Sequence, residues 1–244
     1  MKGVVHAGMI HYFDEIGLKP DIISGTSAGA IVGALYASGN TGKQIRDFFL
    51  NERPYSASMW AGKMGLIKTQ EIKQILQKHM EHDCFEDLKI PLITTATNLM
   101  SGNIHYFSEG RLFDRVLASA SFPGVFSPME MDGALYSDGG ILNHFPVDVI
   151  RNQSDFLIGM HLSPNKILQS SNLTSTRDIL ARAVDIQGSA AEIKKLALCD
   201  IALCPEELVQ YSTFDFDKAK MHEMFDLGYA YIKAQSDKLI PLIS

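Results

Sequence analysis

The pentapeptide Gly25-Thr26-Ser27-Ala28-Gly29 constrains the fold of this chain more than any other segment. Residues 20–24, just before it, form a short β-branched run that predicts a strand. Residues 30–36, just after it, predict a helix rich in small side chains. A serine at such a junction sits in a sharp, strained turn that exposes its hydroxyl, and glycine at both flanks avoids side-chain clashes. The segment therefore predicts a strand–turn–helix unit of a parallel α/β fold, with Ser27 as a candidate nucleophile.

Helices and strands are predicted to alternate along the rest of the chain. The predicted helices are residues 5–16, 69–80, 111–120, 174–198 and 217–234. The predicted strands are residues 91–97, 103–107, 135–137, 155–162 and 200–203, with an Asp-Gly hairpin turn at 132–133. Because no repeat, low-complexity tract or linker interrupts this pattern, we expect one α/β domain over residues 1–244.

Composition narrows the possible partners and the compartment. A net charge of −6 argues against a nucleic-acid partner bound through a basic face. The three cysteines form neither a disulfide framework nor a C-x-x-C metal pair, which indicates a reducing compartment. No signal peptide and no bilayer-spanning apolar run are recognised. We expect a cytoplasmic protein, with a peripheral position at the inner membrane surface as an option; the sequence does not define its oligomeric state.

A serine nucleophile needs a base, and histidine is the usual one. The histidines on predicted helices are interpreted as surface or helix-end residues: His6, His11, His79, His82 and His222. His144 and His161 are better placed, since one follows a strand closely and the other ends one. However, an α/β-hydrolase triad requires several strands before its nucleophile, and too few residues precede Ser27 for that topology.

Asp138 is the stronger candidate for the base. It ends a predicted strand, and Gly139-Gly140 lets the chain turn away from its carboxylate. An ordinary aspartate, with a pKa of about 3.9, is a weak base at neutral pH. Burial would raise that pKa and favour proton transfer from Ser27. A simple Asp-Gly-Gly turn without a catalytic role is the alternative interpretation.

A second enzyme class shares part of the glycine pattern. Residues 24–29 resemble the glycine-rich turn of short-chain dehydrogenases, and Tyr229 with Lys233 makes a Tyr-x-x-x-Lys pair. Ile31 stands where the last glycine of that turn belongs, and the Tyr-Lys pair lies near the end of the chain. Both departures make the dehydrogenase hypothesis the weaker one.

Together, these segments resemble the patatin-like phospholipase family, in particular its bacterial members. The matching segments are Gly-Thr-Ser-Ala-Gly-Ala at 25–30, residues 118–126, Asp-Gly-Gly at 138–140, Asn143, Pro146, residues 216–218 and residues 227–229. The resemblance spans nearly the whole chain, and the order of the two glycine motifs is specific to this family.

The resemblance implies a three-layer α/β/α sandwich with a mostly parallel central sheet. Ser27 would attack an ester carbonyl, Asp138 would act as general base, and water would hydrolyse the acyl-enzyme. The implied substrates are lipid esters such as phospholipids and lysophospholipids, with transient contact to a membrane or micelle surface. No metal or organic cofactor is implied.

One departure from the family concerns the oxyanion hole. The family's Gly-Gly-Gly-x-Lys/Arg-Gly loop is represented here by Lys2-Gly3, and its first strand and leading glycines have no counterpart in this chain. Lys2, Gly3 and Ala28 are therefore the expected contributors to the hole. Loss of one oxyanion donor can slow an enzyme by about 10²–10³. A catalytically impaired lipid-binding or scaffold protein of the same fold is the alternative function.

Residues 51–66 are the least regular part of the chain and carry several large apolar side chains, including Trp60. Aromatic groups suit a membrane interface, so a lid or membrane-touching loop is one interpretation, and coverage of the core is the other.

Overall fold

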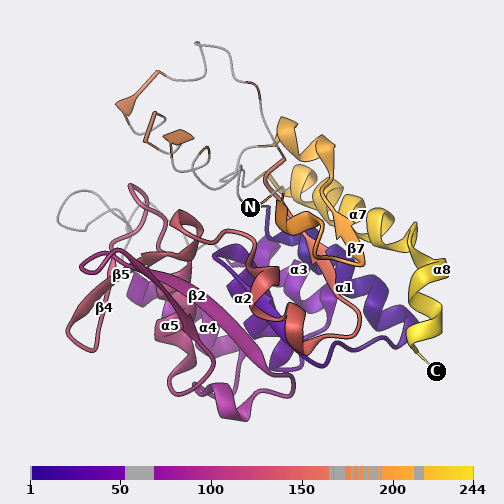
Figure 1. Ribbon diagram of the computed structural model, residues 1–244, viewed down its shortest axis with the longest axis horizontal. Coiled ribbons are helices and arrows are strands. Elements are labelled where there is room, and N and C mark those ends of the chain that lie inside the picture. The colour runs from indigo at the N-terminus through magenta and orange to yellow at the C-terminus, as the bar shows by residue number, and fades with distance from the viewer. Residues whose placement is uncertain are drawn as a thin grey trace.

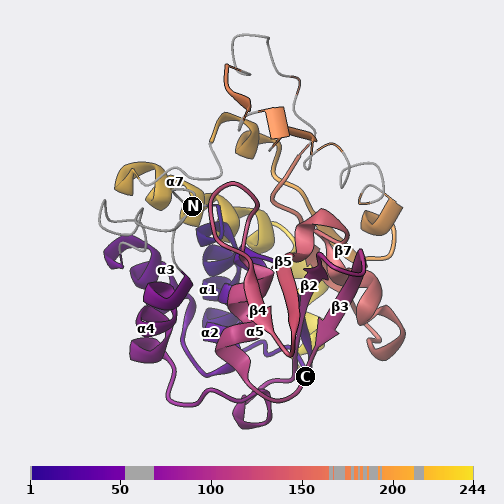
Figure 2. The ribbon, with the colours of Figure 1, turned by 90° about the vertical axis from the view of Figure 1, so that its left-hand side faces the viewer.

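The computed structural model describes residues 2–52, 69–164, 194–211 and 217–243, with a few positions between 167 and 192 that include Glu192. The α-helices are α1 (Val4–Ile16), α2 (Ala28–Ala37), α3 (Gly42–Asn51), α4 (Thr69–His79), α5 (Leu112–Ser119), α7 (Lys218–Lys233) and α8 (Ser236–Leu239). The strands are β1 (Ile23–Gly25), β2 (Leu92–Asn98), β3 (Asn103–Phe107), β4 (Met129–Met131), β5 (Ala134–Asp138), β6 (Ile158–Met160) and β7 (Ile201–Leu203). Figures 1 and 2 show most of the helices gathered on one side of the strands. Among these helices, none is long and apolar enough to cross a bilayer.

Most predicted elements are confirmed, but helix α3 is an element that the sequence interpretation missed. Its start carries a capping box, in which the Thr41 side chain accepts from the Gln44 amide and the Gln44 side chain accepts from the Thr41 amide. Its apolar side chains Ile45, Phe48 and Phe49 are buried in the core. The predicted helix over 174–198 and the lid over 51–66 lie largely outside the described residues.

Strand β2 is the centre of the five-stranded sheet and sets the position of its neighbours. Thr94 pairs with Gly25 of β1 and with Phe107 of β3, so these two partners lie on opposite sides of β2. Ala96 pairs likewise with His105 of β3 and with Asp138 of β5. Because β3 occupies one side throughout, β1 and β5 share the other. They run toward each other along it, and their C-terminal ends meet.

The sheet is mixed, although the family resemblance implied a mostly parallel one. β1 runs parallel to β2, whereas β3 and β5 run antiparallel to β2, and β4 runs antiparallel to β5. The reason is the length of the connections, since β2–β3 and β4–β5 are joined by tight turns. Such turns can only join antiparallel strands. At the second of them, Asp132 and Gly133 both have positive φ, as the predicted Asp-Gly turn requires.

Apolar side chains cover both faces of this sheet. Helices α2 and α5 pack on one face, and α1 lies against α2. The other face near β1 is covered by a small cluster made by Phe145, Val147, Ile150 and Leu157. Layers on the two faces of a sheet are the arrangement that the predicted sandwich requires.

Strands β6 and β7 form a separate parallel pair beside the main sheet. A cavity of about 630 Å³ lies between β6 and β1, lined by residues 22–25 and 156–160 and by His6 and Phe13 of α1.

Helices α1 and α7 cross at very short range and lie side by side in Figure 1. A Cβ atom added to Gly8 would lie 1.9 Å from the carbonyl oxygen of Phe225. A Cβ atom added to Gly228 would lie 2.0 Å from the carbonyl oxygen of Val5. Both distances are far inside van der Waals contact with backbone, so glycine is required on each helix.

We predict that Gly8→Ala and Gly228→Ala each destabilise the fold by about 1–3 kcal/mol or more, because the two backbones must separate. In an unconstrained helix, the same change would stabilise by up to about 1 kcal/mol. Gly29→Ala in α2 is the matched control, since its added Cβ would meet only His6 Nε2, at 3.8 Å. Urea unfolding of the three variants measures this difference. Equal stability for Gly8→Ala and Gly29→Ala would contradict the close crossing.

Candidate active site

Ser27 occupies a strained turn between β1 and α2. Its backbone has φ 56° and ψ −120°, a conformation that residues other than glycine rarely adopt. A Cβ atom added to Gly25 would lie 2.5 Å from the carbonyl oxygen of Gly29, so the first flanking glycine is required. The expectation of a clash is wrong for Gly29, where an added Cβ would have room. Gly29 contributes to the turn through its carbonyl group, which lies close to Gly25, and a side chain at position 29 would be tolerated.

Several hydrogen bonds hold the turn in this conformation. The Ser27 amide donates to Ser119 Oγ, at the end of α5, over 2.9 Å. The Thr26 hydroxyl lies 2.6 Å from the Thr95 hydroxyl of β2 and donates to the Asn143 carbonyl oxygen over 2.8 Å. The strained residue is thus tied to three segments that are distant in sequence. Such support is what allows a strained backbone conformation to persist.

The Ser27 side chain points at Asp138. Ser27 stands at the N-cap position of α2, but its hydroxyl does not cap the helix. Instead, Oγ donates to Asp138 Oδ2 over 2.7 Å, across 111 residues of sequence. Asp138 is 2% exposed, and its Oδ1 accepts from the Gly140 amide over 2.7 Å. The two ends of β1 and β5 that meet along β2 therefore bring a hydroxyl and a carboxylate together.

Glycine at 139 has a steric reason as well. A Cβ atom added there would lie 2.1 Å from Thr95 Oγ1 and 2.5 Å from the Thr95 carbonyl oxygen. The Asp-Gly-Gly segment is therefore held against β2 by close packing, beyond what an ordinary turn requires.

Burial raises the pKa of the Asp138 carboxyl, as the sequence analysis expects. Desolvation is the largest influence and raises its pKa above the ordinary aspartate value. The hydrogen bonds from Ser27 and Gly140, and the nearby His144, act in the opposite direction without reversing the shift. The carboxylate is thus a better proton acceptor than an exposed aspartate.

His144 and His161 were the better placed histidines in the sequence, and they lie next to Glu192. Within the described part of the chain, neither His144 nor His161 bonds to Ser27; both turn toward Glu192. Burial alone would lower the pKa of His161, but hydrogen bonds with Cys204 and Glu192 raise it to about 9.

His6 was expected at the surface, and this is wrong. It lies in α1 near the first turn of α2 and lines the cavity beside β1. Burial, and then the electrostatic influence of His144 and His161, lower its pKa to about 4. His6 is therefore neutral at neutral pH.

The residues expected around the oxyanion hole lie at the start of α1 and of α2. Gly3 passes close to Ala28, since a Cβ atom added to Gly3 would lie 3.1 Å from the Ala28 Cβ. Ala28 begins α2, so its amide is one of those that the helix itself cannot use. The Lys2 ammonium donates to the Leu162 carbonyl oxygen over 3.4 Å. The backbone next to Lys2 is thus placed beside the serine turn.

The Tyr-x-x-x-Lys pair lies on α7, where it contacts α1. The Tyr229 hydroxyl donates to Glu15 Oε2 over 2.7 Å, and the Lys233 ammonium donates to the Tyr229 hydroxyl over 3.2 Å. Both side chains are engaged on the outer helices, which leaves the dehydrogenase interpretation without support.

Three supporting residues escaped the sequence interpretation. Ser119 and Thr95 anchor the serine turn, and the Ser121 carbonyl oxygen accepts from the Asp138 amide over 3.1 Å. Ser119 and Ser121 lie in the 118–126 segment that resembles the family. The resemblance identified this segment but did not predict that it supports the serine turn and Asp138. Thr95 offered no such signal, because a threonine within a strand is common.

We predict that Ser27→Gly is more stable than Ser27→Ala by about 1 kcal/mol. Both variants lose the hydroxyl, but only glycine relieves the strained φ, worth about 1–3 kcal/mol, at an entropic cost of about 0.5–1 kcal/mol. Urea unfolding measures the difference. If the alanine variant were the more stable of the two, Ser27 would not be strained in the folded protein.

Comparison with known proteins finds relatives of this chain. An uncharacterized NTE family protein of Mycobacterium tuberculosis is 30% identical over 172 residues, which covers 66% of this chain and 46% of that protein. Lysophospholipase nte1 of Aspergillus niger is 25% identical over 279 positions, which covers 98% of this chain and 17% of that protein. The chain thus spans less than half the length of either relative.

The crystal structure of VipD from Legionella pneumophila shares the fold, with a TM-score of 0.52 and 14% identity, covering 98% of this chain and 65% of that one. Residues 1–151 match the family described as patatin-like phospholipase. This match takes in both the serine turn and the Asp-Gly-Gly segment, and the chain belongs to the patatin-like phospholipase family.

Proposed function

We propose that this chain is a lipid acyl hydrolase in which Ser27 and Asp138 form a catalytic dyad. The observation that carries the proposal is the 2.7 Å hydrogen bond from a hydroxyl on a strained turn to a buried carboxylate. A nucleophile within hydrogen-bond reach of its base is the arrangement that covalent catalysis requires. Family membership favours a carboxylic ester of a lipid as the substrate.

The proposed reaction begins with proton transfer within the dyad. As Ser27 Oγ attacks the ester carbonyl carbon, its proton passes to Asp138 Oδ2. The tetrahedral intermediate then collapses, the C–O bond to the leaving alcohol breaks, and Asp138 returns the proton to that alcohol. In the second half, Asp138 takes a proton from water as the water oxygen attacks the acyl carbon. The bond from that carbon to Ser27 Oγ then breaks, Asp138 returns the proton to Oγ, and the fatty acid leaves.

Backbone amides provide the proposed stabilisation of the oxyanion. The Ala28 amide lies at the positive end of α2, and the Gly3 backbone lies beside it. Preorganised donors of this kind act where negative charge develops in the transition state. Lys2 contributes to the hole through its backbone, since its side chain reaches toward Leu162.

A lipid substrate implies contact with an apolar surface. Leu99 and Met100, at the turn after β2, are exposed, with 47% and 69% of their surface accessible. Leu135 of β5 is also exposed, and its carbonyl oxygen accepts a hydrogen bond from the Leu99 amide, so the three residues lie at the same end of the sheet. We propose this end of the sheet as the place of transient contact with a membrane or micelle.

Ser27→Ala is expected to reduce hydrolysis of a lysophospholipid or a p-nitrophenyl ester by about 10³-fold or more, because the variant lacks the hydroxyl that donates to the Asp138 carboxylate. Ser38→Ala is the matched control at the opposite end of α2, where the hydroxyl only donates to the Ala34 carbonyl oxygen. Steady-state kinetics of both variants measure the effect. Hydrolysis that survives in Ser27→Ala would exclude the proposed nucleophile. If the wild-type chain binds lipid without hydrolysing any ester, the alternative of a lipid-binding protein replaces the enzyme.

Asp138→Asn is expected to lower kcat by about 10²–10⁴-fold, because an amide cannot accept the Ser27 proton. Asp132→Asn, in the β4–β5 turn, is the matched control, since this side chain is 83% exposed and asparagine tolerates positive φ. Circular dichroism verifies that both variants fold. Near-normal turnover by Asp138→Asn would show that another group accepts the proton.

The rate should depend on pH through Asp138. The base must be ionised to work, so kcat/KM rises with pH as Asp138 loses its proton. Because burial raises the pKa of this carboxyl, the rise should come above the ordinary aspartate range, which centres on about 3.9. A pH–rate profile measures the step. A rate that is already constant at the ordinary aspartate pKa would contradict the assignment.

A further inference from the structure

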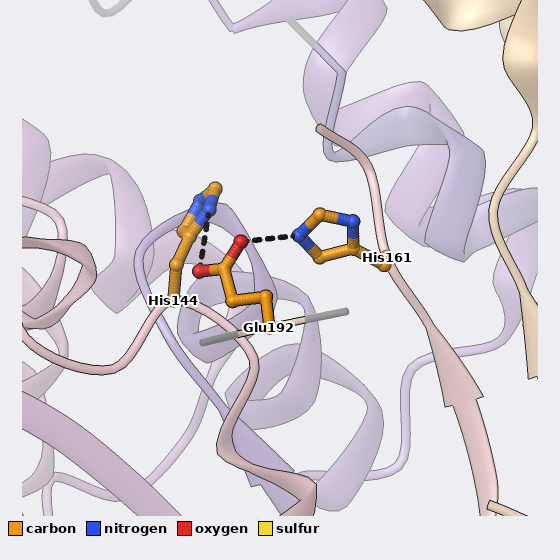
Figure 3. A group of neighbouring side chains, drawn as sticks. All are labelled: His144, His161 and Glu192. Carbon is orange, nitrogen blue, oxygen red and sulfur yellow. Dashed lines mark hydrogen bonds and ion pairs between the residues drawn. The ribbon is translucent and has the colours of Figure 1, made fainter. Parts of the chain in front are cut away.

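A second cluster of ionisable side chains lies near Asp138 and has no part in the mechanism above. His144 follows the turn η3 (Gly139–Ile141), His161 directly follows β6, and Glu192 precedes the described segment 194–211. In Figure 3, the two rings lie on either side of the Glu192 carboxylate. One candidate ligand atom from each of the three side chains lies within 4.8 Å of the other two.

The contacts within this cluster are unequal. His161 Nε2 lies 2.8 Å from Glu192 Oε2, which is a hydrogen bond. His144 Nδ1 lies 3.6 Å from the other carboxylate oxygen, Oε1, which is too long for one. His161 and Glu192 are only 6% and 4% exposed, whereas His144 is half-buried. The carboxylate is thus held firmly at one oxygen only.

The second carboxylate oxygen is the observation that points to a ligand. Glu192 Oε1 is buried and finds no hydrogen-bond partner among the residues that the structure describes. A buried charged acceptor without a partner is costly, because it has lost water without gaining a replacement. The neighbouring imidazole nitrogen faces this oxygen across a gap that a bound cation would bridge.

We propose that His144, His161 and Glu192 form a binding site for a divalent transition-metal ion, with Zn²⁺ best suited. The expected ligand atoms are His144 Nδ1, His161 Nε2 and the Glu192 carboxylate. Two imidazoles and one carboxylate are an established zinc ligand set, with bonds of about 2.0–2.2 Å. Such bonds place ligand atoms about 3.3 Å apart in a tetrahedron, so small side-chain rotations suffice. The proton between His161 and Glu192 leaves to solvent when the metal binds.

The two rings are also supported from behind. His161 Nδ1 lies 3.7 Å from Cys204 Sγ, which leaves Nε2 as the nitrogen that faces Glu192. His144 packs against the turn after Asp138, since a Cβ atom added to Gly140 would lie 3.0 Å from His144 Cδ2. Metal-binding histidines commonly have their second nitrogen or their ring fixed in this way.

A metal here would connect three parts of the chain that are separated in sequence. It would hold the loop after Asp138, the end of β6 and the Glu192 segment together on one ion. Because the ion binds the folded site and not the dispersed ligands, occupancy should stabilise the fold. The alternative is a plain buried ion pair between His161 and Glu192, with His144 nearby.

The test is a titration of the chelator-treated protein with Zn²⁺, measured by isothermal titration calorimetry. The wild-type chain should bind one equivalent, and Glu192→Gln should bind about 100-fold more weakly or worse. Glu130→Gln, an exposed residue of β4, is the matched control and should bind as the wild type does. Cys204→Ser should weaken binding by about 10–100-fold, because it disturbs only the support of His161.

A second readout separates metal binding from a structural defect. Zn²⁺ should raise the melting temperature of the wild-type chain and of Glu130→Gln, but not of Glu192→Gln. His144→Asn, at the half-buried ligand, serves the same purpose if Glu192→Gln fails to fold. Absence of a one-equivalent binding phase, or the same affinity in Glu192→Gln and Glu130→Gln, would overturn the site and leave the ion pair. None of these readouts depends on esterase activity.

Discussion

The pairing of β2 with two strands along one edge is the constraint on which the site depends. β1 reaches this edge in parallel and β5 in antiparallel orientation, and their ends stop at Thr94 and Ala96, two residues apart on β2. This register leaves the turn after β1 facing the end of β5. Ser27 and Asp138 are therefore neighbours because of sheet geometry, and the side chains need only small adjustments to form their hydrogen bond.

Two unfavourable features are concentrated at this junction. Ser27 has a strained backbone, and Asp138 has its carboxyl removed from water. Each costs free energy of folding, and the rest of the molecule has to offset that cost. The close crossing of α1 and α7, the buried faces of α2 and α5, and the Thr26–Thr95 contact supply rigid surroundings. In the proposed mechanism, the same features expose the nucleophile and raise the proton affinity of the base.

Local sequence patterns predicted the features that depend on local geometry. The serine turn and the Asp-Gly-Gly segment were recognisable because steric limits at Gly25 and Gly139 leave few alternatives. Strand direction was less predictable, since it follows from connection lengths. Ser119 and Thr95 could not be identified, because their partners are distant in sequence. The His144–His161–Glu192 cluster likewise lacks any short spacing, so the sequence indicated no metal. Helix α3 did have a readable signal, the Thr41–Gln44 capping box, which was overlooked.

The proposed function depends above all on Ser27 being a nucleophile that Asp138 activates. The most direct measurement is the rate of covalent labelling by a fluorophosphonate probe, with the adduct mapped by peptide mass spectrometry. We expect one adduct per chain, on Ser27, and a much slower reaction in a folded Asp138→Asn variant. An adduct on a different serine, or equal labelling rates in the two proteins, would contradict it.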